Sequence, residues 1–317
     1  MLQEPKIDSL IAFVIPLFNE EKNVAPIAQS IRSIFATLDG YTYTILFVDD
    51  GSSDHTLQNI KNLSLQYDEI SFISFSRNFG KEAALLAGFN NTSPRADAVI
   101  TIDADLQHPP DLIPEIISKW KEGNEVVYTY RDKNNEHASF LSRLNSLLFY
   151  WVMSKLADVK LENGISDFKL IDKKVLATVK EMKEDAPFFR GLFKWVGYKQ
   201  VGIAYKVNER LHGKTKYATK ALVKLALHNI TSFSTKPLTM AIYIGFFTSF
   251  MSVLYIPYIF YSLITGQAIS GWASTIATIV FFGGVQLIVL GIIGLYLGKI
   301  FIQTKQRPQY IINESAI

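Results

Sequence analysis

The feature that most constrains the fold of this chain is a long stretch without charge near its C-terminal end. From Pro237 to Gly298 the sequence contains no Asp, Glu, Lys, Arg or His. A membrane-spanning helix needs ~20 mostly apolar residues, so this stretch is long enough for two spans. We expect them at about 237–264 and 274–302, joined by a short uncharged turn. The sequence therefore predicts contact with a lipid bilayer through a two-helix hairpin.

Basic residues flank this apolar pair on both sides: Lys220, Lys224 and Lys236 precede it, and Lys299, Lys305 and Arg307 follow it. Lysine and arginine concentrate in the cytoplasmic segments of membrane proteins. We therefore expect a multi-pass protein of the cell inner (plasma) membrane whose main domain and both termini are cytoplasmic. Three glycines in the second span, Gly291, Gly294 and Gly298, would allow close helix contact and leave a homo-oligomer open.

The apolar pair divides the chain into four expected parts. These are a cytosolic domain at 1–216, a juxtamembrane amphipathic helix at 217–235, the two spans within 236–303 and a cytosolic tail at 304–317. In the second part, apolar residues lie on one side of a helical pattern, with Lys220, Lys224 and His228 elsewhere. That pattern is typical of a helix lying on a membrane surface, and a helix packed in the soluble core is the alternative.

The first part alternates strand and helix patterns. Strands are expected at 9–16, 42–48, 70–75, 99–102 and 124–130, and helices at 24–38, 55–67 and 82–89. Short connections between such elements indicate an α/β fold with a parallel, right-handed, doubly wound sheet. Polar clusters follow the strands, so we expect them to converge on one crevice at the carboxyl edge of the sheet.

Two carboxylates follow the strand at 99–102. Asp103 and Asp105 are one residue apart, and Pro109 and Pro110 prevent a regular element directly after them. At this spacing both side chains of an extended chain point to one face. Like charges so close repel each other unless a cation is near, which favours a divalent ion bound to oxygen ligands. The alternative is a polar turn in which one aspartate caps a helix that begins near Pro110.

Composition and missing motifs exclude several classes of function. The chain has no cysteine, which rules out disulfides, thiolate metal sites and cysteine nucleophiles. Its net charge of +3 does not suggest nucleic-acid binding. Neither the glycine-rich dinucleotide fingerprint nor the P-loop motif is present, which argues against a dehydrogenase or a P-loop phosphotransferase.

Three segments together resemble glycosyltransferase family 2 with the GT-A fold, a Rossmann-like domain with a mostly parallel sheet. They are Ile15–Glu20, Val48–Asp54 and Asp103–Pro109. The segment Arg77–Lys81 and the later features are similar to the polyprenyl-phosphate branch. That branch contains dolichol-phosphate mannose synthase and bacterial glucosyltransferases that load undecaprenyl phosphate. The resemblance covers essentially the whole chain.

This resemblance implies inverting transfer of a sugar, with glucose as first choice, from a UDP-linked donor to a polyisoprenyl phosphate. It implies catalytic roles for Asp103, Asp105 and Asp167, with Mg²⁺ or Mn²⁺ held by Asp105 and Gln107. The implied nucleotide-sugar pocket comprises Pro16, Asn19, Glu20, Asp49, Asp50, Lys81, Asp103, Arg210 and Lys216. The implied ligands of the acceptor phosphate are Arg131, Arg143, Arg210 and Lys216.

Plainer interpretations of some of these residues stay open. Arg143 fits the solvent face of an ordinary amphipathic helix, although arginine also presents a fork that matches phosphate oxygens. Asp167 fits a helix cap. The loop around Arg210 resembles a family loop in which Thr215 replaces the usual serine, and it also fits a solvated surface loop.

Two other functions share features with this sequence. A processive polysaccharide synthase shares the first three motifs, but such enzymes commonly carry a Gln-x-x-Arg-Trp motif and more spans, which this sequence lacks. A membrane-tethered, non-catalytic protein that binds a nucleotide sugar or a lipid phosphate is the other alternative, and the Asp103 and Asp105 pair argues against it.

Overall fold

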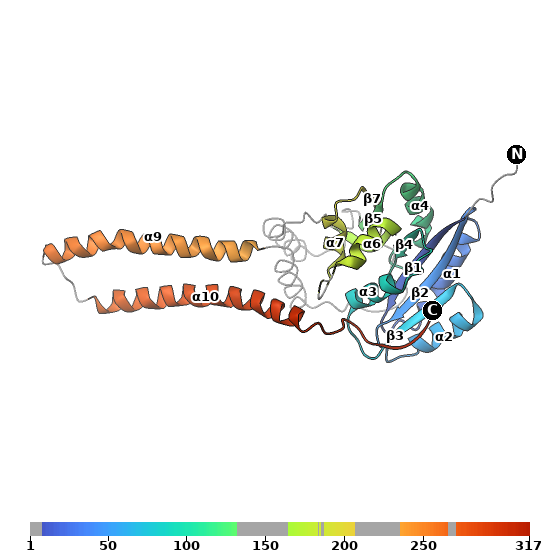
Figure 1. Ribbon diagram of the computed structural model, residues 1–317, viewed down its shortest axis with the longest axis horizontal. Helices are drawn as coiled ribbons and strands as arrows, with labels where there is room; N and C mark the ends of the chain where they lie inside the picture. The colour runs from blue at the N-terminus through green and yellow to red at the C-terminus, as the bar shows by residue number, and fades with distance from the viewer. Residues whose placement is uncertain (1–7, 132–163, 183, 185–186, 207–234, 266–270) are drawn as a thin grey trace. The chain divides into compact units, whose positions relative to one another are not determined.

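The structure, a computed structural model, describes residues 8–131, 164–182, 184, 187–206, 235–265 and 271–317. These residues belong to two compact units. The sheet unit contains the described residues up to 206 together with 307–317, and the helical unit contains 235–306 (Figure 1). The helix patterns noted near Arg143 and at 218–234 lie outside the described residues.

An eight-stranded sheet forms the centre of the sheet unit, in the order β7-β5-β6-β4-β1-β2-β3-β8. The strands are β1 (Ser9–Leu17), β2 (Tyr41–Asp49), β3 (Ile70–Phe75), β4 (Ala98–Thr101), β5 (Val126–Arg131), β6 (Ile165–Asp172), β7 (Gln200–Tyr205) and β8 (Ile312–Ala316). The five strands expected from the sequence are present, within about two residues at each end.

The sheet is mixed and mostly parallel, and its antiparallel strands correct the parallel, doubly wound pattern inferred from the alternation of strand and helix. Strands β4, β1, β2 and β3 are parallel neighbours, and β5 is parallel to β7. Strand β6 lies between β4 and β5 and is antiparallel to both, while β8 is antiparallel to β3. The amino-terminal half of β6 therefore reaches the edge at which the parallel strands have their carboxyl ends.

Helices cover both faces of the sheet: α1 (Val24–Phe35), α2 (Thr56–Gln66), α3 (Lys81–Asn91), the short η1 (Pro110–Leu112), α4 (Ile113–Lys121), α6 (Lys173–Glu181) and α7 (Phe189–Trp195). Buried residues of α1, α2 and α4 share one core with Ile11, Phe13 and Ile15 of β1. Helix α3 packs on β1 and β2 from the face opposite to α1, α2 and α4, and it contacts α6. The continuous apolar run of β1 is thus buried on both faces, as expected for a central strand.

Glycine 88 sets how closely α3 approaches the sheet. A Cβ atom at this position would overlap the side chain of Val14 in β1. Because glycine lacks that atom, the helix lies directly against the strand. This contact fixes the position of α3 against β1. Helix α3 begins at Lys81, so the contact also helps to position that residue.

The end of the chain adds a strand that the sequence did not reveal. Strand β8 pairs with β3, and the backbone nitrogen of Ser76 donates to the carbonyl of Ile311 at 3.0 Å. The rings of Tyr310 and Phe75 stack with centroids 5.2 Å apart. The Lys61 ammonium lies 2.6 Å from a carboxylate oxygen of Glu314. The expected tail thus ends as an edge strand of this sheet.

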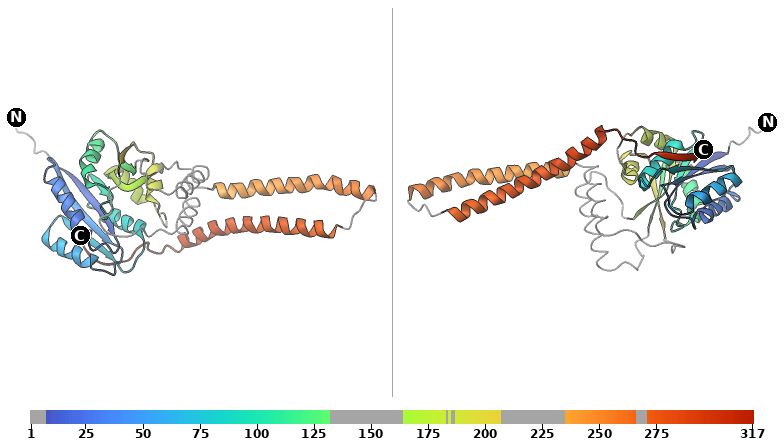
Figure 2. Two further views of the ribbon diagram at one scale, coloured as in Figure 1. Left: turned by 180° about the vertical axis from the view of Figure 1, so that it is seen from behind. Right: turned by 90° about the horizontal axis from the view of Figure 1, so that it is seen from below.

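The helical unit consists of α9 (Lys236–Ile264) and α10 (Trp272–Thr304), which run side by side in both views of Figure 2 and contact each other. Both helices begin and end within two residues of the expected spans. By length and composition, Phe281–Thr304 is the single segment within the described parts of the chain that could cross a membrane. This is weak evidence for membrane association, and the expected pair of spans is not confirmed as a pair.

Candidate functional site

The loops after β1 and β2 are bonded to each other at the carboxyl edge of the sheet. The side-chain carbonyl of Asn19 accepts a hydrogen bond of 2.8 Å from the backbone nitrogen of Ser53. The backbone nitrogen of Asn19 donates to Ser52 Oγ at 2.9 Å, and that of Glu20 donates to Thr56 Oγ1 at 2.8 Å. Asn19 has a φ of 55°, a left-handed conformation that asparagine tolerates better than most residues. Pro16 pairs in register with Val48 directly below these loops.

Asp49 and Asp50 are buried and hold the neighbouring backbone in place. Asp49 accepts from the backbone nitrogen of Ser52 at 3.2 Å and from Ser74 Oγ at 2.8 Å. Asp50 accepts from the backbone nitrogens of Phe79 at 2.6 Å and Gly80 at 2.9 Å, directly before α3. Burial raises the pKa of Asp50, although these N–H groups oppose the shift. The two carboxylates therefore fix the geometry of the turns after β2 and β3.

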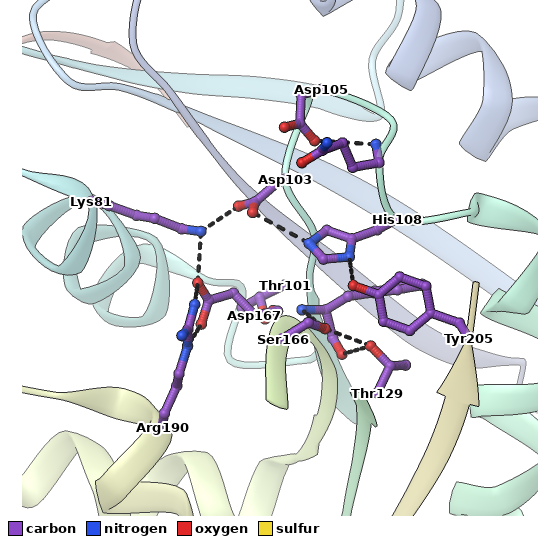
Figure 3. A network of polar contacts seen from close by, with 12 residues as sticks. Lys81, Thr101, Asp103, Asp105, His108, Thr129, Ser166, Asp167, Arg190 and Tyr205 are labelled. Carbon is purple, nitrogen blue, oxygen red and sulfur yellow. Dashed lines mark hydrogen bonds and ion pairs between the residues drawn. The ribbon is translucent and has the colours of Figure 1, made fainter. Parts of the chain in front are cut away.

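Asp103 and Asp105 lie in a turn, because β4 ends at Thr101. The argument that an extended chain points both side chains to one face is therefore wrong here. Asp103 contacts Lys81 Nζ at 2.6 Å and His108 Nε2 at 3.3 Å, whereas Asp105 accepts from the backbone nitrogen of Gln107 at 3.2 Å (Figure 3). The residue that precedes η1 is Pro109, so neither aspartate caps this helix.

Asp167 is not the helix cap that the plainer interpretation suggested. It lies inside β6, is buried, and receives hydrogen bonds from two cations. Arg190 Nε and Nη2 each donate to Asp167 at 2.7 Å, one bond to each oxygen, and Lys81 Nζ donates to Oδ2 at 2.7 Å. Figure 3 shows Lys81 between the carboxylates of Asp103 and Asp167. The cap of the following helix, α6, is Asp172.

The charges of this network shift one another's ionisation. Burial would raise the pKa values of Asp103 and Asp167, but Lys81 acts together with His108 at Asp103 and with Arg190 at Asp167 and holds both pKa values well below the usual range. Burial likewise opposes the charge on Lys81, but the two aspartates raise its pKa overall. Asp103 therefore already has a cation beside it. In the sequence analysis, repulsion between Asp103 and Asp105 favoured a bound metal ion. At Asp103 the ammonium of Lys81 relieves this repulsion instead.

Two acid–base groups deeper in the cluster have pKa values near neutrality. Burial, together with the charge of Asp167, raises the pKa of Glu82 to about 7. Its buried Oε2 atom has no hydrogen-bond partner among the residues that the structure describes. Burial lowers the pKa of Lys169 to about 8. Both groups therefore change charge within the physiological range.

A second chain of contacts orients Asp103 from the other side. The Tyr205 hydroxyl lies 2.8 Å from His108 Nδ1, and His108 Nε2 faces the Asp103 carboxylate. Because a carboxylate only accepts, the imidazole carries a proton on Nε2 and donates it to Asp103. His108 is buried. The imidazole of His108 therefore connects Tyr205 of β7 to the turn that contains Asp103.

Sequence analysis missed Arg190 and Tyr205, and it gave His108 no separate role. Arg190 and Tyr205 belong to no motif, and each follows an ordinary run of apolar residues. Their roles depend on contacts between distant parts of the chain. Of these three residues, only His108 could have been found from the sequence, because it lies within Asp103–Pro109, one of the segments that resemble the family.

Only one of the four predicted ligands of the acceptor phosphate lies within the described residues. Arg131 ends β5 and is exposed. Burial raises the pKa of the Tyr205 hydroxyl, and the Arg131 guanidinium opposes this shift, which places the two side chains together. Arg143, Arg210 and Lys216 lie outside the described residues.

The oxygen donors near the Asp103 turn fit a divalent ion that is shared with a ligand. Within the described parts of the chain, no group of three or more His, Cys, Asp or Glu side chains could form a complete metal cage. Magnesium commonly binds through one or two carboxylates and completes its shell with water and substrate phosphates. The Asp105 carboxylate and the Gln107 amide carbonyl are hard oxygen donors of this kind.

The family described as Glycosyl transferase family 2 matches residues 12–179. An uncharacterized glycosyltransferase of Bacillus subtilis, YkcC, is 40% identical over 96% of this chain and 93% of its own length. A protein of Shigella phage SfII named bactoprenol glucosyl transferase is 39% identical over 96% of this chain and 98% of its own.

A solved structure shares the fold. It is glucosyl-3-phosphoglycerate synthase from Mycobacterium tuberculosis, in complex with Mn²⁺, UDP and glucosyl-3-phosphoglycerate. The match has a TM-score of 0.50 at 18% identity and covers 71% of this chain and 79% of that one. At this identity the likeness supports the GT-A-like arrangement of the sheet unit.

Proposed function

This chain belongs to glycosyl transferase family 2, and from that membership we propose that it transfers glucose from UDP-glucose to a polyprenyl phosphate. The observation that carries the proposal is the similarity to bactoprenol glucosyl transferases, which extends over nearly the whole of both chains. The similarity includes the apolar C-terminal helices as well as the sheet unit. The product is a single glucosyl group joined through phosphate to a polyprenyl lipid.

The donor binds at the carboxyl edge of the sheet, over the loops that follow β1, β2 and β4. The interlocked loops at Asn19, Glu20 and Asp49 form the nucleotide side of this site. Asp105 and Gln107 would hold Mg²⁺ or Mn²⁺ together with the donor diphosphate, and the ion would neutralise charge as the nucleoside diphosphate leaves. Asp103 stays fixed beside this position by Lys81 and His108.

The acceptor needs little help from a base. A phosphate monoester with a second pKa of about 6 is largely dianionic at neutral pH and is already nucleophilic. The surroundings of Asp167 agree with this, because three charge-assisted hydrogen bonds occupy its oxygens and hold its pKa low. Asp167 therefore orients the cations around the acceptor. Attack opposite the leaving group inverts the anomeric centre.

The membrane part of the proposal follows from the lipid acceptor. A polyprenyl phosphate presents its head group at the bilayer surface, so the enzyme must work there. We propose that α9 and α10 both span the inner membrane, with the sheet unit and both termini in the cytoplasm, where nucleotide sugars are made available. The segment Phe281–Thr304 has the length and composition for one of these spans.

The test uses the full chain, purified in detergent, with UDP-[¹⁴C]glucose and undecaprenyl phosphate. We expect one labelled lipid that carries one glucose, and no transfer after chelation with EDTA until Mg²⁺ or Mn²⁺ is restored. Asp105→Ala should abolish this metal-dependent transfer, while Asp111→Ala, an exposed acid six residues later, should retain it. A polymeric product would indicate a polysaccharide synthase. Donor binding without any transfer to lipid would indicate a binding protein.

A further inference from the structure

The Asp167 network is layered by charge, with the anion inside and the cations outside. The Asp167 side chain is 8% exposed, while those of Lys81 and Arg190 are 37% and 40% exposed. A buried carboxylate that lost its partners would be left uncompensated, so Asp167 holds both cations firmly. Here two positive groups are held by a buried carboxylate and still reach solvent.

The hydrogen bonds of Arg190 use one edge of its guanidinium and leave the other edge without an acceptor among the described residues. Its hydrogen bonds to the described residues run from Nε and Nη2, and both end on Asp167. A guanidinium carries five N–H donors in a rigid fork, so the Nη1 edge and the second Nη2 hydrogen remain for another acceptor. A planar fork of this kind matches two oxygens of a phosphate.

The other charges near Arg190 favour an anion. Three cations and three acids form the cluster: Lys81, Lys169 and Arg190, with Glu82, Asp103 and Asp167. Burial raises the pKa of Glu82 to about 7, so near neutral pH this acid is partly protonated. Lys169, with a pKa lowered to about 8, is still mostly charged there. The six charges cancel when Glu82 is ionised, and the cluster is positive to the extent that Glu82 holds its proton.

We propose that Arg190, held by Asp167, binds the phosphate group of the acceptor lipid through the Nη1 edge of its guanidinium, beside the ammonium of Lys81. This inference rests on the proposed function and adds a ligand outside all of the predicted phosphate-binding residues. Asp167 is the positioning residue of the pair, because it orients both cations. The same chemistry would suit an oxygen of the donor diphosphate, so the test separates the two sources.

The experiment measures transfer by the full chain while undecaprenyl phosphate and UDP-glucose are varied separately. For Arg190→Gln we expect the KM for undecaprenyl phosphate to rise about 10- to 100-fold, the loss typical of a charge-assisted hydrogen bond to a ligand. The KM for UDP-glucose and the affinity for UDP, measured by calorimetry, should change less than about twofold. The KM of Arg190→Lys for undecaprenyl phosphate should lie between those of the wild type and Arg190→Gln, because lysine keeps the charge but lacks the guanidinium fork.

Two comparisons keep this outcome distinct from a general loss of structure. Arg32→Gln removes a guanidinium of similar exposure from α1, where it pairs with Glu69 at 3.1 Å, and should leave both KM values unchanged. Thermal unfolding of each variant reports the structural cost. Loss of stability cannot by itself raise one KM and spare the other.

The inference is overturned if Arg190→Gln transfers glucose with an unchanged KM for the lipid. It is also overturned if the KM for UDP-glucose rises instead, since the site would then belong to the donor. If the wild-type chain transfers no glucose to undecaprenyl phosphate, the proposed function itself fails. The two failures are therefore distinguishable.

Discussion

The raised pKa of Glu82 predicts that this acid destabilises the protein as pH rises. In the folded state its pKa is about 7, against an ordinary value of 4.5. Between these values the folded protein holds a proton that the unfolded chain has released. Stability therefore falls as pH rises from about 4.5 to 7, and the loss persists at higher pH.

The size of this effect follows from the two pKa values. A difference of about 2.5 units at 1.36 kcal/mol per unit is about 3 kcal/mol at pH 8, and the penalty is below about 1 kcal/mol at pH 5. Glu82→Gln keeps the shape of the side chain but cannot ionise. We therefore expect the variant to match the wild type at pH 5 and to be more stable at pH 8, by about 6–12 °C in Tm at 2–4 °C per kcal/mol.

The assay is thermal unfolding of the full chain in detergent from pH 5 to pH 8.5. Glu69→Gln is a control of opposite sign. Burial opposes the charge of Glu69, but hydrogen bonds from Tyr43 and Arg32 contribute to a lowered pKa, so this variant should be less stable than the wild type at pH 8. A difference between Glu82→Gln and the wild type that stays constant from pH 5 to pH 8 would refute the reasoning. So would a variant that is less stable at pH 8.

Three further changes test the surrounding structure. Gly88→Ala should destabilise the protein by about 1–3 kcal/mol, because its Cβ overlaps Val14, and Val14→Ala in the same chain should recover part of the loss in thermal unfolding. Tyr205→Phe leaves His108 Nδ1 buried without its 2.8 Å partner and should cost about 1–3 kcal/mol, with unchanged chemical denaturation arguing against the contact. Deleting 307–317 removes β8 and exposes the edge of β3, so light scattering should show concentration-dependent aggregation that the intact chain lacks.

Much of the sheet unit could be predicted because its pattern is local. Apolar runs such as that of β1 and helical spacing such as that of α1 depend on neighbours only a few residues apart. The polar turns at Asn19, Asp49 and Asp103 follow strand ends, and parallel strands bring those ends to one edge. The structure confirms these elements and their grouping.

The contacts made by the site charges needed the tertiary structure. Asp167 was expected near the acceptor, yet its place depends on β6 running antiparallel between β4 and β5. That arrangement brings the amino-terminal half of β6 to the edge where the parallel strands end. Strand order arises from pairings between residues far apart in sequence, and local periodicity does not encode it.

By itself, the sequence determined which segments are apolar, which turns carry charge and how helix alternates with strand, because each property depends on a short window of residues. The folded chain alone decided that Lys81 joins Asp103 to Asp167, that Arg190 holds Asp167, and that β8 covers β3. These contacts arise when long-range packing brings buried charges together, and each charge then needs a partner supplied from a distant part of the chain.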